Sequence, residues 1–198
     1  MKFARYESHG EVHYGIVEGD SVRAITSSPF EKYELTDHVH KLSDVKLLVP
    51  TEPLNLMTTG INALSHQHSD QNKNQFSPKW AERTVPGVSI RNLGSLQNPE
   101  EPIIRPDDAP TFREEAELVV VIGKKCHKIS KDEVYDHILG YTCGNDVCVK
   151  EWEEQKEAWK SKCCDTMHPV GPWIETELDP MNVMIRARVN GKTVQEEA

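Results

Sequence analysis

The residues whose types and spacing point most directly to chemistry are two glutamates at the start of an apolar run. Glu115 and Glu117 are separated by a single alanine and are followed by the apolar residues 118–122. In a β-strand, residues two apart share a face and lie roughly 6.6 Å apart. Two carboxylates directed at one partly apolar site repel each other, and a divalent cation removes that penalty. A solvated face at a strand end fits the same spacing, so the pattern alone leaves both interpretations open.

A third carboxylate, Asp146, follows Gly144 and Asn145 at the junction between a predicted strand and a predicted helix. An aspartate at this position is a common N-cap, because its side chain accepts hydrogen bonds from the first helical N–H groups. It could instead supply a third oxygen ligand beside Glu115 and Glu117. No local spacing rule links it to those glutamates.

The elements that must position these residues can be read from hydrophobic periodicity. Residues 1–26 alternate around turns at Gly10 and Gly19, which predicts a short β-meander. Strands are expected over 115–123 and 141–146. A helix is expected over 131–139 with Ser130 as its N-cap, and a second over 147–160.

The C-terminal part ends in a predicted hairpin. Residues 183–189 alternate between apolar and polar side chains up to Asn190-Gly191, a strong two-residue turn signal. The chain stops seven residues after Gly191, so we expect a domain that is C-terminally short, or a last strand that pairs with another subunit. The expected division is a small N-terminal β unit and linker over 1–56 and a metal-binding domain over 57–198.

Composition narrows the classes of partner. The 198 residues include 37% hydrophobic and 28% charged residues, with a formal net charge of −9. This balance predicts a globular protein and argues against nucleic acid or an anionic membrane as a partner, because both need a basic face. No signal peptide or membrane helix is visible. The five irregularly placed cysteines indicate reduced thiols, hence a cytoplasmic protein, with a mitochondrial location left open.

Four blocks, in this order and spacing, resemble the signature of the fumarylacetoacetate hydrolase family. They are residues 115–124 (Glu-Ala-Glu-Leu-Val-Val-Val-Ile-Gly-Lys), 140–146 (Gly-Tyr-Thr-Cys-Gly-Asn-Asp), 162–173 (beginning Lys-Cys-Cys-Asp-Thr) and 189–195 (beginning Val-Asn-Gly-Lys). A weaker block is Gly60-Ile61-Asn62 followed by His66. The resemblance implies an α+β protein with a mixed β-sandwich or roll core, commonly dimeric, that acts on short oxo acids with Mg²⁺ or Mn²⁺.

The same resemblance implies roles for individual residues. Glu115, Glu117 and Asp146 match the three carboxylate ligands of the family's Mg²⁺ or Mn²⁺, with Ca²⁺ a further candidate. Lys162 matches a lysine beside the site that supports the substrate anion, although a lysine closing a helix C-terminus is the commoner fate. His66 matches the histidine that activates water from a lid, here the polar residues 65–79.

Three departures from the family pattern keep the reaction open. The lid glutamate that partners the histidine is replaced by Ser69, so Asp70 would have to orient His66, and His68 could take its part. Glu153 stands where the family has a glutamine that meets the substrate. The family's C-terminal Gly-Thr-Pro segment is absent.

We therefore expect a metal-dependent hydrolase that cleaves a C–C bond in an acylpyruvate-like β-diketo or 2-oxo acid. An oxaloacetate-like decarboxylase, a hydratase or isomerase, and a catalytically impaired binding paralogue are the alternatives. A zinc site is a further, less favoured reading, because no Cys-x-x-Cys pair exists. Its candidate ligands would be Cys143, Cys148, Cys163, Cys164 and His168.

Overall fold

The N-terminal unit is an antiparallel meander, as predicted. The computed structural model describes residues 1–60 and 87–197. Its first strands, β1 (Lys2–Ser8), β2 (Glu11–Glu18) and β3 (Ser21–Ile25), pair in sequence order. A fourth strand, β4 (Leu35–Lys41), continues the meander beyond the predicted limit, and β5 (Lys46–Leu48) pairs with β1.

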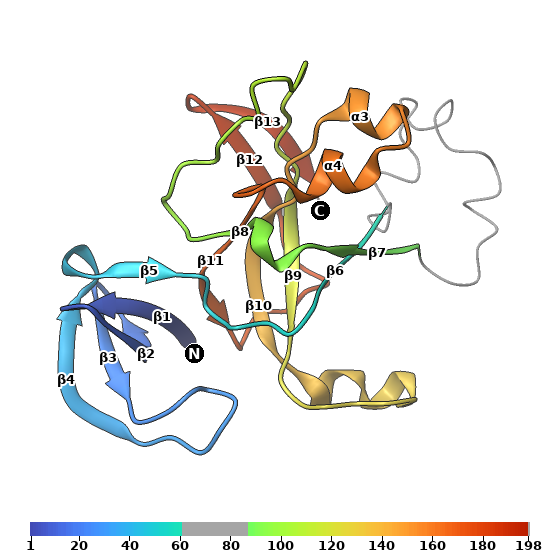
Figure 1. Ribbon diagram of the computed structural model, residues 1–198. Helices are drawn as coiled ribbons and strands as arrows, with labels where there is room; N and C mark the ends of the chain where they lie inside the picture. Colours follow the sequence, from blue (N-terminus) through green and yellow to red (C-terminus); the bar gives the residue numbers. More distant parts are fainter. Residues whose placement is uncertain (61–86, 198) are drawn as a thin grey trace.

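The meander is continuous with the central strands of the chain in one nine-stranded sheet, and two further hairpins form separate two-stranded sheets. The order of the nine-stranded sheet is β4-β3-β2-β1-β11-β10-β9, in which β1 joins β11 (His168–Glu175) through Phe3 and Ile174. Next to β11 lie β10 (Ile138–Asn145) and β9 (Ala116–Ile122), both antiparallel to their neighbours. Figure 1 shows the meander in blue at the lower left and the two α-helices in orange at the upper right. The chain has the expected α+β fold.

Short elements complete the described part of the chain. They are the hairpin of β6 (Leu56–Thr59) and β7 (Val88–Arg91), the strand β8 (Leu96–Gln97) parallel to β11, and the 3₁₀ helices Leu42–Asp44, Leu93–Ser95 and Lys131–His137. Ser130 precedes the last of these, and its N–H and hydroxyl both donate to the Glu133 carboxylate. The predicted helix start is therefore confirmed, although the helix is 3₁₀. No helix in the described residues is long and apolar enough to span a membrane.

The predicted single helix over 147–160 is wrong. Two short helices replace it, α3 (Lys150–Glu154) and α4 (Ala158–Cys163). Lys156 adopts a left-handed backbone (φ 65°), and the Glu157 N–H bonds back to the Trp152 carbonyl, which is the hydrogen-bond pattern that terminates a helix. As a result Trp152 is buried whereas Trp159 is 73% exposed.

The predicted strand over 115–123 is present as β9, but it is not a buried strand. It lies at one edge of the sheet, and only Val121 among its residues is fully buried. The predicted C-terminal hairpin is confirmed: β12 (Ile185–Val189) and β13 (Lys192–Glu197) flank Asn190 and Gly191, which both have positive φ. That conformation is the one that a two-residue hairpin turn requires.

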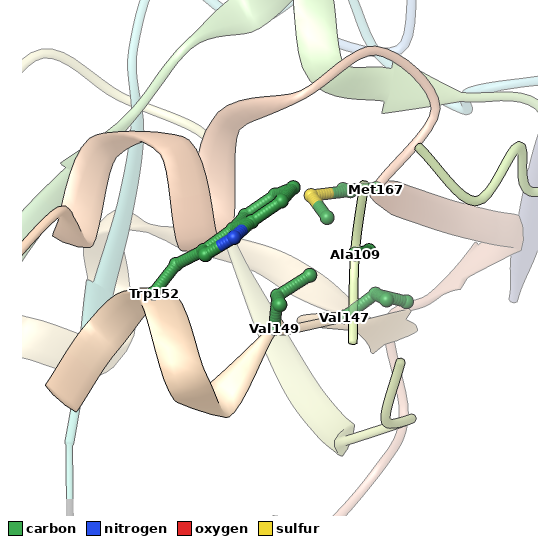
Figure 2. Close-up of a cluster of buried hydrophobic side chains, with 5 residues drawn as sticks. All are labelled: Ala109, Val147, Val149, Trp152 and Met167. Atoms are coloured by element: carbon green, nitrogen blue, oxygen red, sulfur yellow. The ribbon is translucent and has the colours of Figure 1, made fainter. Parts of the chain in front are cut away.

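A small hydrophobic cluster anchors the two segments that carry the site described below. Figure 2 shows the Trp152 ring beside Met167, with Val147 and Val149 on the adjacent segment. Val147 directly follows Asp146, and Met167 directly precedes His168. The Val147 N–H also donates to the Met167 carbonyl at 3.2 Å. The burial of this cluster therefore ties the end of β10 to the start of β11.

Candidate metal centre

The carboxylates predicted from sequence meet where β9 begins and β10 ends. The two strands are antiparallel, and Glu117 lies opposite Gly144 in their register. Glu115 immediately precedes β9 and Asp146 immediately follows β10, and the Asp146 N–H donates to the Glu115 carbonyl at 2.8 Å. The sheet register therefore brings the predicted carboxylates to one end of this strand pair.

Lys162 bridges two of these residues. Its Nζ donates to Oε2 of Glu115 at 2.5 Å, to Oδ2 of Asp146 at 2.9 Å and to the Asp146 carbonyl at 2.7 Å. Three acceptors satisfy the three N–H groups of an ammonium. Lys162 lies in the last turn of α4, but it is only 7% exposed, so the surface role considered for it is wrong.

Asp146 does not cap a helix. The helix α3 begins at Lys150 with Val149 as its N-cap residue, and the Asp146 carboxylate is engaged elsewhere. Arg91 donates from Nε to Oδ1 at 2.9 Å and from Nη2 to Oδ2 at 2.8 Å, a bidentate ion pair. Nε2 of His168 lies 2.7 Å from Oδ1. Sequence reasoning missed Arg91 entirely and considered His168 only as a zinc ligand.

Further polar groups support this cluster. Nδ1 of His168 lies 2.7 Å from the Ser95 hydroxyl, which donates to the Asn92 carbonyl. Ser95 and His168 are both buried, so this series of hydrogen bonds is shielded from solvent. On the other side, the Cys148 thiol donates to Oε1 of Glu115 at 3.0 Å.

The charges of the cluster shift its ionisation. Burial opposes the charge of Asp146, but hydrogen bonds from Arg91 and His168 and the charge of Lys162 hold its pKa well below the usual range. Burial also opposes the charge of Lys162, yet Asp146 and Glu115 raise its pKa above the usual value. Both groups are therefore ionised at neutral pH.

The pKa values of Glu117 and Cys148 are instead shifted so that the neutral form of each side chain is favoured. Partial burial, together with the negative charges of Asp146 and Glu115, raises the pKa of Glu117 to about 7. Burial and the hydrogen bond to Glu115 raise the pKa of the Cys148 thiol to about 12. Cys148 is therefore a protonated donor, and the nearby charge of Lys162 offsets only part of the upward shift in the pKa of Glu117.

The donor set fits a hard divalent cation in chemistry. Three carboxylates from two adjoining strand ends are the oxygen ligands that Mg²⁺ and Mn²⁺ prefer. The Glu117 carboxylate makes no hydrogen bond within the described residues, and its pKa is raised first by burial and then by the charges of Asp146 and Glu115. As arranged here, however, no three such side chains in residues 1–60 and 87–197 converge closely enough to hold an ion. Oxygens of Glu115 and Asp146 are instead bonded to Lys162 and Arg91.

A pocket beside the strand pair is a separate feature. Its volume is about 710 Å³, and it lies between β12 and the β9–β10 pair, with a mainly apolar lining. Of the three candidate ligands only Glu117 borders it. It is therefore not the site that the charged cluster forms.

Of the remaining predicted site residues, only Glu153 lies within the described part of the chain. His66 and Asp70, together with His68, Ser69 and the predicted lid over 65–79, lie outside the described residues. Glu153 is exposed on α3, and its charge acts on Cys148.

All five cysteines are free thiols. His168 is engaged by Asp146 and Ser95, and Cys148 is a protonated donor to Glu115. The zinc arrangement considered above is not seen in the described residues.

Several proteins of known sequence are similar to this chain over most of its length. An uncharacterised protein of Methanocaldococcus jannaschii is 33% identical over 84% of this chain and 69% of its own length. The 2,4-didehydro-3-deoxy-L-rhamnonate hydrolase of a Sphingomonas species is 30% identical over 98% and 72%. The mitochondrial oxaloacetate tautomerase fahd2 of Xenopus laevis is 34% identical over 80% and 49%.

Solved structures show the same fold. A 5-carboxymethyl-2-hydroxymuconate delta-isomerase from Mycobacterium smegmatis superimposes with a TM-score of 0.86 at 31% identity, covering 100% of this chain and 75% of that one. A maleylpyruvate hydrolase from Sphingobium, in complex with manganese(II) and pyruvate, has a TM-score of 0.75 at 22% identity, covering 99% and 76%. The second likeness concerns the fold alone.

Family models match nearly the whole chain. Residues 1–50 match the Rv2993c-like N-terminal model, and residues 55–198 match the fumarylacetoacetate (FAA) hydrolase C-terminal model. The relatives with named activities are hydrolases, isomerases, decarboxylases and tautomerases. The chain belongs to the fumarylacetoacetate hydrolase family.

Proposed function

We propose that this protein is a divalent-metal-dependent enzyme that cleaves a C–C bond next to a carbonyl in a short β-diketo or 2-oxo acid, by hydrolysis. The observation that supports the proposal is that the register of β9 and β10 brings Glu115, Glu117 and Asp146 to one end of the strand pair, where the buried Lys162 bonds to Glu115 and Asp146. Clustered carboxylates at a protein interior are costly unless cations pair with them. The raised pKa of Glu117 marks the place where a further cation would be favourable.

The chain's own residues have distinct roles in this proposal. Glu115, Glu117 and Asp146 would hold Mg²⁺ or Mn²⁺, which when bound would polarise the carbonyl of an oxo acid. Lys162 stays cationic, because Asp146 and Glu115 raise its pKa, so it stabilises negative charge and does not act as a base. Cys148 stays protonated and orients Glu115.

The base that activates water is proposed to be His66, with Asp70 as its partner. Imidazole titrates near neutral pH, which suits general base catalysis. This assignment rests on the family resemblance of the segment around residue 66. Glu153 is proposed to border the substrate, and its charge would disfavour a second anionic group at that end.

A second candidate reaction is decarboxylation or tautomerisation of an oxo diacid. The observation that favours it is Ser69, which replaces the glutamate partner of the lid histidine in the family pattern. Both reactions need stabilisation of negative charge on the carbonyl oxygen but no attacking water, and decarboxylation, which removes no proton from carbon, also tolerates a weakened base. The Xenopus laevis relative at 34% identity is named as an oxaloacetate tautomerase.

The decisive experiment is turnover of acetylpyruvate, fumarylpyruvate and oxaloacetate, each with Mn²⁺ or Mg²⁺ and each with a chelator. Two acid products identify hydrolysis, and one acid with carbon dioxide identifies decarboxylation. A spectral change of the substrate without any cleavage product identifies tautomerisation. If none of the three is consumed while Mn²⁺ still binds, the proposed substrate class is wrong. If Mn²⁺ does not bind, the metal-dependent function itself is wrong.

A further inference from the structure

Every acceptor position of the Asp146 carboxylate is occupied by a side chain of the protein. Oδ1 accepts from Arg91 Nε at 2.9 Å and lies 2.7 Å from His168 Nε2. Oδ2 accepts from Arg91 Nη2 at 2.8 Å and from Lys162 Nζ at 2.9 Å. A carboxylate has about four lone-pair positions. A cation that binds either oxygen must therefore displace one of these donors.

Two of the three donors are held by other partners as well. Lys162 also donates to Glu115 and to the Asp146 carbonyl, and His168 also bonds to the buried Ser95. Arg91 differs, because within the described residues its side-chain hydrogen bonds all go to Asp146. It is also the last residue of β7, a four-residue strand whose only partner in the described part of the chain is β6.

The balance of charge points to the same residue. Glu115, Glu117 and Asp146 carry three negative charges at full ionisation, against two permanent positive charges on Arg91 and Lys162. A divalent cation added to this cluster would leave it with an excess positive charge. An arginine released from Asp146 would then face a site that favours an incoming anion.

We propose that Arg91 is the counter-ion that a divalent cation displaces from Asp146, and that the released guanidinium then binds a carboxylate of the substrate. The inference rests on the proposed function and adds to it an anion-binding residue and an order of events. Guanidinium is suited to both partners, because its planar N–H groups match a carboxylate bidentately whether that carboxylate is Asp146 or an oxo acid. Lys162 and His168 keep Asp146 oriented throughout.

The test measures Mn²⁺ and oxalate binding in place of turnover. Free Mn²⁺ is followed by electron paramagnetic resonance during titration of the wild-type protein, Arg91→Met and Arg91→Lys. Oxalate, a small dianion, is then titrated calorimetrically into each Mn²⁺-loaded protein. Lys46→Met is the matched control, since it removes a cation from an exposed pair with Glu101 outside the cluster.

We expect Arg91→Met to bind Mn²⁺ about tenfold more tightly than the wild type, because the competing charged hydrogen bonds are gone. Its Mn²⁺-loaded form should bind oxalate at least about tenfold more weakly. Arg91→Lys, which keeps the charge but not the bidentate geometry, should fall between the two, and it provides the test if Arg91→Met does not fold. Lys46→Met should match the wild type in both titrations.

The opposite outcome is equally clear. If Arg91→Met binds Mn²⁺ more weakly and oxalate equally well, Arg91 merely orients Asp146 and the inference is overturned while the proposed function stands. Tighter Mn²⁺ binding with unchanged oxalate binding would overturn the assignment of Arg91 to the substrate carboxylate. Absence of Mn²⁺ binding in every variant would overturn the metal-dependent function, and the inference with it.

Discussion

The imidazole of His168 lies between two buried groups, with Nε2 2.7 Å from Oδ1 of Asp146 and Nδ1 2.7 Å from the Ser95 hydroxyl. The Ser95 hydroxyl also bonds to the Asn92 carbonyl, so the imidazole is linked through Ser95 to the backbone before β8. Residue 168 therefore connects the loop before β8 to the carboxylate at the end of β10, and both ring nitrogens take part.

The first prediction concerns this connection. Replacing His168 by leucine removes one of the two hydrogen bonds at Oδ1 of Asp146 and the contact between Nδ1 and the Ser95 hydroxyl, and the loss of a buried hydrogen bond to a charged group costs about 1–3 kcal/mol. We expect a loss of stability of that size in urea unfolding. His168→Gln, which can still donate to Asp146, should recover part of it. Equal stability of the leucine variant and the wild type would show that the contact contributes nothing.

The second prediction concerns Lys162. Replacing it by methionine removes one cation from Glu115 and Asp146 together, and breaking a buried ion pair from one side typically costs about 3–5 kcal/mol. We expect a correspondingly large shift of the urea midpoint in the metal-free protein. Added Mn²⁺ should reduce the shift, because the cation supplies the missing positive charge.

Lys46→Met again provides the control, since the Lys46 side chain is 51% exposed in its pair with Glu101. Exposed pairs contribute little to stability, so this variant should unfold like the wild type. A Lys162→Met protein as stable as the control would mean that Lys162 does not compensate the buried carboxylates.

Sequence reasoning could predict those features of the candidate site that follow from the two-residue alternation of side chains along a strand. Alternation placed Glu115 and Glu117 on one strand face, and the Asn190-Gly191 turn fixed the last hairpin. The resemblance to family blocks added Asp146 and Lys162, whose meeting with Glu115 depends on the register of β9 against β10. Register between strands is a property of the whole sheet and not of any short window.

The parts that sequence reasoning missed depend on long-range contacts. Arg91 is 55 residues from Asp146 along the chain and His168 is 22 residues away, so no motif spacing connects them. The broken helix over 147–160 has a different cause. Lys156 is not a residue that usually adopts positive φ, and burial of Trp152 against Met167 favours the break although periodicity suggested a continuous helix.

The third prediction concerns the close approach of β10 and β11. A Cβ placed on Gly140 would lie 2.5 Å from the Glu175 carbonyl oxygen, a backbone atom that cannot move away without bending the strand. Gly140→Ala should therefore destabilise the protein by about 1–3 kcal/mol, as overpacking does elsewhere. Gly94→Ala is the control, because its nearest neighbour would be an Asn92 side-chain atom at 3.5 Å. If both variants unfold alike, the strand spacing is less tight than described here.

The fourth prediction concerns pH and Glu117. The pKa of this carboxyl rises from its ordinary 4.5 to about 7 in the folded protein, so the folded state binds the proton more tightly than the unfolded state. The contribution of Glu117 to stability is therefore fully present below pH 4.5, and it is lost as the pH rises toward about 7. Asp146, with its lowered pKa, acts in the opposite sense and only in acid.

The measurement is urea unfolding of the chelator-treated protein at intervals between pH 4.5 and 7. Glu117→Gln, which cannot ionise, should lack the loss of stability that the wild type shows across this interval. Mn²⁺ should abolish the loss in the wild type, because it favours the ionised carboxylate, and should have little effect on Glu117→Gln, which lacks the ligand. Metal-dependent turnover should be lost in the same variant. A wild-type profile unaffected by Mn²⁺, or a glutamine variant with undiminished turnover, would remove Glu117 from the metal centre.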